Sequence, residues 1–417
     1  MKRLCGPLSI FFLIFVFPYL AAQEGGLDWD IDTIFDEPLP ETPVEQPENT
    51  TEVSALNLVR QRGFTFDANY EFIAGLAPGW DVYPWVSADD EHFSWGQALK
   101  VNASLGLTAQ ISEVFRVRNT IGFSIPDFGF NLGDLFFDYN MYDRIFFRGG
   151  KYSLAWGISP NFGFTNLLAR VPGNSYSGDS YIFKADVPVG VGGVQLLTMT
   201  RANLMGGDVP ARKDFGFGGK YNLAFHWADF DMGAFYQEGM ALRGFLSIKT
   251  TIGNTEFYNE WLTAVDIDDK YNTSGAGNLG FARDFFNNKL SVNGELFFNA
   301  EGESYWYRPE SSYRDAETSP FIEGFNMALN LLYRPGGRGE PRLFLQTLYA
   351  PMQESIRLVP GFRLRPWQHI ELYLAVPVAL GNKNGYYYSY TADPDNRPFS
   401  VVMLITLSGS VQAGYHY

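Results

Sequence analysis

The chain has 417 residues, of which 17% are aromatic, 43 are glycine and only 18% are charged. Soluble domains usually contain about 25% charged residues, so this composition argues against a soluble helical protein. A mean hydropathy of −0.13 also excludes the strongly apolar profile of a helical membrane protein. The formal net charge of −15 is unevenly distributed, because segments 1–22, 23–59 and 60–417 carry +2, −10 and −7.

The first 22 residues have the pattern of an export signal. Two basic residues precede an apolar run over 8–20, and the small residues Ala21 and Ala22 follow it. The run is short for a membrane span, so we expect cleavage after Ala22, with a retained N-terminal anchor as the alternative. The single cysteine, Cys5, lies in this segment, so we expect the mature chain to have no disulfide and no thiolate metal site.

Residues 23–59 differ in chemistry from the rest of the chain. They hold ten acidic residues and four prolines, and no Lys or Arg occurs between Arg3 and Arg60. Such a segment cannot bury enough apolar surface to offset the entropy of ordering it. We expect a disordered acidic spacer, with a partner-binding motif as the alternative.

Beyond residue 60 the sequence alternates repeatedly between apolar and polar residues. Segment 98–111 alternates at all fourteen positions, and 63–74, 215–227 and 370–380 follow the same pattern. No run after Ala22 reaches the roughly 20 apolar residues of a membrane helix. A soluble β-sandwich also alternates, but its strands hold about 5 to 6 residues, whereas several here reach 11 or more. The pattern therefore predicts an all-β fold, a closed antiparallel transmembrane β-barrel over 60–417.

Turn-forming residues divide this barrel into hairpins. Counting strands between the turns gives about 18, with 16 as the alternative. The first strand then begins, and the last strand ends, on the same periplasmic side of the membrane. Short turns are expected at 112–113, 142–143, 188–189, 228–229, 253–254, 287–288, 336–339 and 366–368, and longer loops at 75–95, 157–179, 202–213, 267–276, 300–321 and 382–398.

One segment breaks the alternation. Arg148 and Lys151 have opposite phases, so an uninterrupted strand would direct one of them into lipid. We expect a bulge at Gly149 and Gly150, because glycine admits the backbone geometry that a bulge requires. The residues then predicted to face lipid are Ile145, Phe147, Tyr152, Leu154 and Trp156.

Assigning the two faces by alternation places many charged side chains on the inner face. Because the inward arginines outnumber the inward acids, we expect a wet lumen that prefers anions. The predicted lumen-facing residues are Arg116, Arg118, Arg144, Arg148, Lys151, Arg334, Arg342, Arg357, Arg363 and Arg365, with Asp134, Asp138, Glu295 and Glu371 as opposing charges.

The last strand supports a family resemblance. Apolar residues alternate from Phe399 to the aromatic residues Tyr415 and Tyr417, and such an ending resembles the assembly signal of bacterial outer-membrane β-barrels of the porin type. The resemblance implies export to the outer membrane of a diderm bacterium, contact with its lipid and with the barrel-assembly machinery, and passive diffusion of small hydrophilic solutes or ions.

The stretch 156–178 resembles the inward-folded third loop of porins, and it is also the third outer loop of the predicted barrel. It is long, and its only charged residue is Arg170. The resemblance makes it a constriction loop, in which we single out Arg170, Asn161, Asn166 and Asn174.

Two other functions remain open. Aromatic residues in the outer loops 300–321 and 382–398 suit a structural or adhesive barrel, and a transporter of hydrophobic compounds is the second alternative. We expect no enzyme, because His92 among acidic residues is the only catalytic candidate and is better explained as solvated. We expect no metal, cofactor or nucleic acid, and the oligomeric state stays open.

The acidic segment gives a first testable prediction. Deleting residues 24–52 should leave a barrel that folds and inserts, because an acidic, proline-containing spacer makes no tertiary contacts of consequence. Heat-modifiable migration on cold gels measures folding. Loss of that migration in the deletion would show that the segment is structural.

Overall fold

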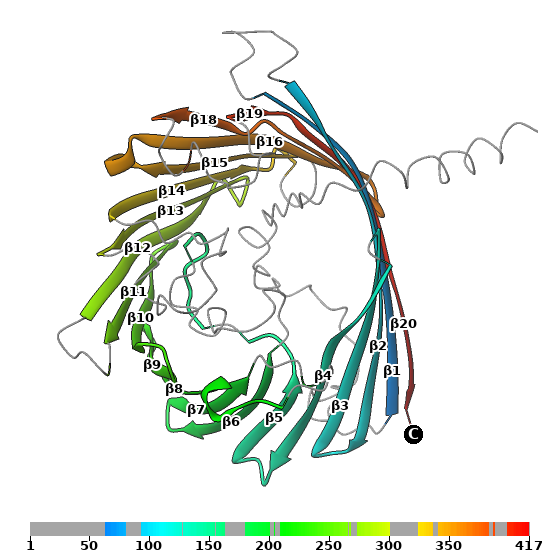
Figure 1. Cartoon of the computed structure of the whole chain (residues 1–417), viewed down its shortest axis with the longest axis vertical. Helices are drawn as coiled ribbons and strands as arrows, with labels where there is room; N and C mark the ends of the chain where they lie inside the picture. Colours follow the sequence, from blue (N-terminus) through cyan, green and yellow to red (C-terminus); the bar gives the residue numbers. More distant parts are fainter. Residues whose placement is uncertain are drawn as a thin grey trace, which may run out of the picture.

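The computed structural model describes residues 63–80, 93–126, 128–154, 156–162, 180–200, 204, 209–265, 267, 273–300, 324–336, 341–382, 387 and 398–416. These residues form a ring of antiparallel strands around a central space (Figure 1). The segments 1–22 and 23–59, expected to be a signal and a spacer, lie outside the described residues. No helix in the described part of the chain is long and apolar enough to cross a membrane.

Twenty strand segments follow one another around the ring, together with the short 3-10 helices η4 (Arg212–Asp214) and η7 (Pro351–Gln353). The segments are β1 (Gly63–Trp80), β2 (Phe93–Ser112), β3 (Phe115–Ile125), β4 (Gly129–Met141), β5 (Ile145–Lys151), β6 (Tyr181–Val189), β7 (Gly192–Thr200), β8 (Phe215–Ala224), β9 (Asp229–Gln237), β10 (Leu242–Ile252), β11 (Thr255–Val265), β12 (Thr273–Phe285), β13 (Leu290–Asn299), β14 (Gly324–Tyr333), β15 (Arg342–Ala350), β16 (Ser355–Trp367), β17 (Ile370–Ala375), β18 (Val378–Gly381), β19 (Phe399–Ser400) and β20 (Val402–His416).

These segments make 18 strands in the described chain, which confirms the predicted number. β17 and β18 are one strand, because both pair with β16 in a single register that continues across Val376 and Pro377. β19 and β20 are likewise one strand, because both pair with β1 in a single register. The ring closes where β1 pairs with β20 from Gly63 opposite His416 to Leu76 opposite Met403.

The connections at one end of the ring are short, as predicted. Described turns join β2 to β3, β4 to β5, β6 to β7, β8 to β9, β10 to β11, β12 to β13 and β16 to β17, close to the positions expected from sequence. Residues 337–340, between β14 and β15, lie outside the described residues. At the opposite end three connections are also short, which the sequence analysis missed. These are 126–128, 238–241 and 351–354.

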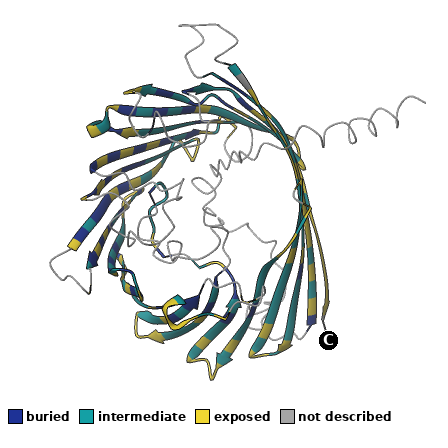
Figure 2. Ribbon diagram, viewed as in Figure 1, coloured by how far each residue is buried: buried dark blue, intermediate teal, exposed yellow. Residues whose placement is uncertain are grey.

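Burial alternates along many strands of the wall (Figure 2), as expected when side chains point alternately to its two faces. The predicted outward residues of the first hairpin are exposed in the isolated chain, with Phe66 at 49% and Leu105 at 53%. Exposed apolar residues of this kind are suited to lipid contact. Segment 215–227 departs from the prediction at its end, because β8 stops at Ala224, and Phe225 and Trp227 lie in the turn.

The predicted bulge at Gly149 and Gly150 was wrong. β5 pairs with β4 and with β6 in an unbroken register through both glycines. The extra residue lies in β4 instead, where Gly133 and Asp134 together face Thr120 of β3. Gly150 has a φ of 136°, a conformation that glycine adopts readily, and β5 ends at the next residue.

The predicted lipid-facing positions of Tyr152 and Trp156 were also wrong. Both lie beyond the end of β5, and they are only 3% and 2% exposed within a cluster of apolar side chains. The chain turns into the ring after Lys151 instead of continuing along the wall (Figure 1). Alternation alone cannot separate a lipid-facing aromatic residue from one that is covered inside the barrel.

Many aromatic rings of the wall lie flat over glycines of the neighbouring strand. A Cβ added to Gly361 would meet the ring of Phe344, and one added to Gly280 would meet the ring of Tyr258. Such pairs are a known device of β-sheets, because the ring covers the backbone that glycine exposes. The abundance of both glycine and aromatic residues therefore has a common structural cause.

This packing predicts the effect of a single methyl group. Gly361→Ala should lower the free energy of unfolding by about 1–3 kcal/mol, because the added Cβ overlaps the Phe344 ring. Phe344→Leu in the same chain should recover part of the loss. The matched control is Gly244→Ala, whose Cβ would meet no atom closer than 3.8 Å. Urea unfolding in phospholipid vesicles provides the measurement, and equal losses in the two alanine variants would contradict the account.

Candidate functional site

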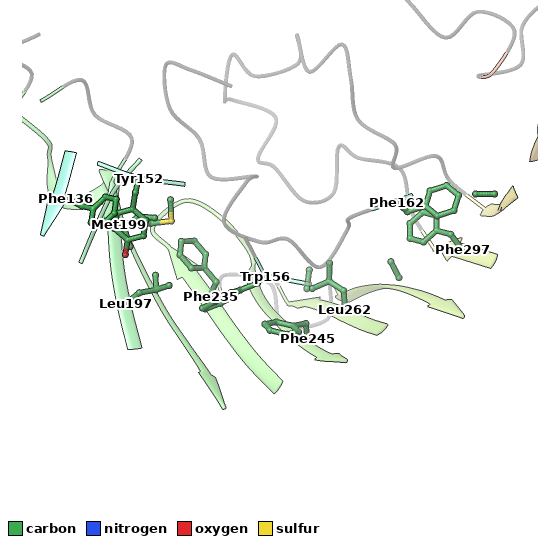
Figure 3. Close-up of a cluster of buried hydrophobic side chains, with 14 residues drawn as sticks. Phe136, Tyr152, Trp156, Phe162, Leu197, Met199, Phe235, Phe245, Leu262 and Phe297 are labelled. Atoms are coloured by element: carbon green, nitrogen blue, oxygen red, sulfur yellow. The ribbon is translucent and has the colours of Figure 1, made fainter. Parts of the chain in front are cut away.

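The candidate site is the inner wall of the barrel together with the segment 152–162. This segment follows β5 and lies against the inner side of the wall from β4 to β14 (Figure 3). Strand residues that contact this segment point into the barrel. Because side chains alternate along a strand, the residues between them point outward. Residues 156–162 of the predicted third loop lie inside the barrel, and residues 163–179 lie outside the described part of the chain.

Apolar contacts seat this segment at two points. The ring of Trp156 packs against Phe245 at 5.6 Å between centroids, and its Nε1 donates to Gln195 Oε1 at 2.7 Å. The ring of Phe162 stacks on Phe297 at 4.8 Å. Both side chains of the loop are almost fully buried, so this part of the loop is a fixed layer on the wall.

Between these two points the loop is held by a fully buried carboxylate, Glu260 of β11. It accepts hydrogen bonds from the backbone N–H groups of Ile158 at 2.8 Å and Ser159 at 3.1 Å. The hydroxyl of Ser247 donates to the same carboxylate at 3.0 Å. A buried charge of this kind is tolerated only when its lone pairs are satisfied, and the loop supplies two of the donors.

A second buried carboxylate, Glu295 of β13, holds the next residues. Asn161 donates to it twice, from its backbone N–H at 3.3 Å and from its Nδ2 at 3.0 Å. The hydroxyl of Ser159 also donates to it, as does Asn278 Nδ2 at 2.6 Å. Glu295 thus anchors the loop from beneath. The sequence analysis predicted that this charge lines the water-filled lumen, and that prediction was wrong, because the loop covers Glu295.

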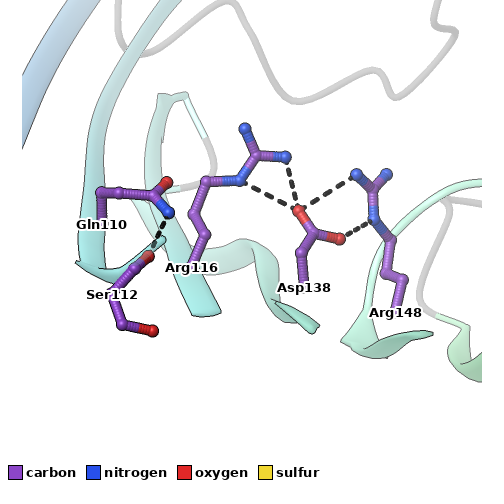
Figure 4. A network of polar contacts seen from close by, with 5 residues as sticks. All are labelled: Gln110, Ser112, Arg116, Asp138 and Arg148. Carbon is purple, nitrogen blue, oxygen red and sulfur yellow. Dashed lines mark hydrogen bonds and ion pairs between the residues drawn. The ribbon is translucent and has the colours of Figure 1, made fainter. Parts of the chain in front are cut away.

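Across the lumen, charged side chains of three neighbouring strands meet on the wall (Figure 4). Asp138 of β4 lies between Arg116 of β3 and Arg148 of β5, and we call these residues the first triad. Arg116 Nε donates to Asp138 Oδ2 at 3.0 Å, and Arg148 Nε donates to Oδ1 at 2.7 Å. Because one carboxylate faces two guanidinium groups, the first triad carries a net charge of +1.

A cavity of about 420 Å³ lies beside the first triad. Arg148 stacks over the ring of Phe136 at 4.4 Å, which holds its guanidinium plane at the cavity wall. The cavity combines cationic, polar and aromatic surface, a combination that suits hydrated anions and polar solutes. Its lining residues are Thr108, Arg116, Arg118, Asp134, Phe136, Arg148, Tyr152 and Ser153.

The same arrangement recurs on β16 and β17. Glu371 lies 2.5 Å from Arg363 Nε and 2.6 Å from Arg365 Nε, and we call these residues the second triad. It also carries +1. Both triads lie near the end of the barrel that has short turns.

The remaining predicted site residues occupy different environments. Arg144 is in the turn 142–144 and is exposed, so it is not on the wall. Lys151 is buried, and its ammonium donates to the carbonyl of Leu132. Arg357 is buried on the inner face of β16, and Arg334 donates to the hydroxyl of Ser291 at 2.7 Å. Arg342 lies directly opposite Arg363.

Several predicted residues lie outside the described part of the chain. These are Tyr417 of the assembly signal and Arg170, Asn166 and Asn174 of the loop, together with His92 and nearly all of the loops 300–321 and 382–398. Tyr415 is described, faces outward and is 68% exposed.

Sequence reasoning missed Glu260 and a series of neutral ion pairs on the inner face. Glu260 has the same phase as Glu256 and Tyr258, so alternation along β11 contained the information. The missed pairs are Lys184 with Asp186 at 2.8 Å, Lys220 with Asp231 at 3.1 Å and Lys249 with Glu256 at 3.0 Å. Among the described residues no group of three or more metal-binding side chains occurs.

The described wall is a closed antiparallel β-barrel of 18 strands with an inward loop, which is the fold class expected from sequence. Solved structures share this fold. OpdO of Pseudomonas aeruginosa matches 84% of this chain and 97% of its own chain, with a TM-score of 0.54 and 10% sequence identity. OccAB1 of Acinetobacter baumannii matches 84% of this chain and 96% of its own chain, with a TM-score of 0.53 and 8% sequence identity. OccK5 of Pseudomonas aeruginosa also matches 84% of this chain, and 98% of its own chain, with a TM-score of 0.51 and 8% sequence identity.

No family model matches the sequence, and no curated protein matches it either. With identities of 8 to 10%, the structural likeness establishes the fold alone.

The two carboxylate anchors predict how the loop can be released. In a Glu260→Ala, Glu295→Ala variant the amides of Ile158, Ser159 and Asn161 should exchange about 10- to 100-fold faster, because each hydrogen bond to a charged group contributes about 1.5–3 kcal/mol. Hydrogen exchange read by mass spectrometry gives the measurement. Glu256→Ala is the control, since Glu256 forms an ion pair with Lys249 of the neighbouring strand. Unchanged protection at the three amides would show that apolar contacts alone hold the loop.

Proposed function

We propose that this protein is an outer-membrane channel for the passive diffusion of small hydrophilic solutes or ions. A single observation carries the proposal: the inner face of a closed 18-strand barrel presents two charged triads, and the first of them lies beside a polar cavity. Side chains alone do not fill a barrel of this size, so water occupies the passage. A wet, charged wall suits hydrated solutes better than apolar ones.

The preferred ion is an anion. Each triad carries +1, whereas the other ion pairs on the inner wall are neutral. Glu260 and Glu295 are covered by the loop and saturated with donors, so they add little negative potential to the passage. The loop segment 156–162 narrows the passage, because it lies against the inner wall. The constriction loop of our proposal also includes Arg170.

The cellular setting follows from the same proposal. Residues 1–22 direct export, the outward apolar face contacts outer-membrane lipid, and the barrel-assembly machinery recognises the last strand with Tyr415 and Tyr417. The chain binds no nucleic acid and performs no chemistry. Its partners are lipid, the assembly machinery and the solutes that pass through it.

The proposal predicts discrete openings in planar bilayers, with a conductance that scales with salt. Under a salt gradient the reversal potential should report anion preference, and Arg116→Ser with Arg118→Ser should shift it towards cations by several millivolts, because two inward positive charges are removed. Arg283→Ser is the matched control, since Arg283 stacks over outward-facing Phe285 at 4.7 Å. A folded, inserted barrel that stays electrically silent would contradict the channel.

A further inference from the structure

Four prolines occupy ladder positions in three neighbouring strand interfaces, from β16 to β1. Each lies directly opposite a residue whose backbone N–H donates to the carbonyl of the proline. The hydrogen bonds are Val376 to Pro360 at 2.9 Å, Ser400 to Pro377 at 3.1 Å, Ala379 to Pro398 at 2.7 Å and Val401 to Pro78 at 2.9 Å.

Each of these pairs keeps one of its two backbone hydrogen bonds. Two residues of a hydrogen-bonded antiparallel pair normally exchange two bonds, and proline has no N–H to donate. The other described prolines are placed as strand geometry usually requires. Pro188 and Pro366 lie one residue from a strand end, and the rest lie in connections.

The inner face at the same level carries a cluster of apolar side chains beside Arg357, which lies opposite Ala379. Val359, Ala375 and Val402 are buried beside Pro360, Pro377 and Val401, and they form one cluster with Leu332 and Phe344. Ala77, next to Pro78, packs against this cluster. The weakened part of the wall therefore adjoins apolar surface, whereas the wall from β3 to β11 carries charged pairs.

Two features bound this weakened section. Towards the end with long loops, the outward rings of Trp80, Phe93 and Phe399 form an aromatic cluster, with centroids 5.0 and 5.4 Å apart. Outward aromatic clusters near strand ends mark the interface between membrane and water. Towards the other end, the second triad ties β16 to β17. The section thus lies within the outer leaflet, just below its surface.

We propose that the wall from β16 to β1 opens sideways at this level and passes amphipathic molecules with an aliphatic or aromatic body between the lumen and the outer leaflet. Loss of four ladder bonds lowers the cost of separating these strands, and the apolar cluster offers the passing molecule a favourable surface. The route is lateral and independent of ion conduction through the axial passage.

The first test measures the weakness of the ladder. In lipid nanodiscs, the amides of segments 374–381 and 399–403 should exchange at least 10-fold faster than those of 215–219, at the same end of β8. Replacing all four prolines with Ala restores four donors and should slow this exchange by a similar factor. Equal exchange in the two chains would overturn the proposed opening.

The second test locks the weakened section with a disulfide bond between two of its strands. Val376 and Val401 face each other between the pairs Ala375 with Val402 and Val378 with Phe399, a non-hydrogen-bonded position whose spacing suits a disulfide. The variant Val376→Cys, Val401→Cys is made in a Cys5→Ser chain. The probe is N-phenyl-1-naphthylamine, which fluoresces when it reaches phospholipid in intact cells.

Uptake of the probe should fall at least 3-fold when the disulfide forms and should recover on reduction. The Cys5→Ser chain without the new cysteines, treated with the same reagents, is the control. Equal uptake in the oxidised and reduced states would overturn the lateral route. Planar-bilayer conductance is recorded separately on the same variant, so a silent channel would contradict the proposed function and not the lateral route.

Discussion

The whole structure depends on satisfying backbone hydrogen bonds where no water is available. In hydrocarbon an unpaired N–H or C=O group costs several kcal/mol, so a sheet can cross a membrane only when its first and last strands pair. Here the pairing of β1 with β20 provides that closure. Closure in turn fixes which face of every strand meets lipid, and the alternation of the sequence follows from it. The four prolines between β16 and β1 are the exception, and they lie near the end of the barrel that has long loops.

The inward loop changes the electrostatics of the lumen as well as its width. Glu260 and Glu295 would be exposed acids on a bare wall, but the loop covers them and its N–H groups donate to them. The buried charges require these donors, and the loop gains fixed anchor points from the same bonds. Covering two acids lowers the negative charge that the wall presents beside the triads, while Asp67, Glu71 and Asp134 stay on the inner face. The position of the loop and the net charge that the inner wall presents to the passage are therefore coupled.

Alternation predicted the strands, the short turns and the inward direction of the triad residues, because lipid and water impose opposite demands on the two faces. It failed at Tyr152 and Trp156, since a covered lumen is a third environment that favours aromatic residues as lipid does. It also misplaced the bulge, because both Gly133 and Gly149 permit one and only the pairing partner decides. The role of Glu295 as a loop anchor could not be predicted, because its donors in the loop lie 134 to 136 residues away in sequence.

The pairing of aromatic rings with glycines connects composition to the site. A ring that lies flat over a glycine of the next strand adds little thickness to the wall, so the passage stays wide although large side chains point inward. Phe235 lies over Gly216 and Gly218 in this way, and the ring of Trp156 rests on the same surface. Tyr258 lies over Gly280, which brings its hydroxyl to 3.4 Å from Glu295. The glycines thus create the flat floor on which the loop is seated, and bulkier residues at these positions would displace the loop into the passage.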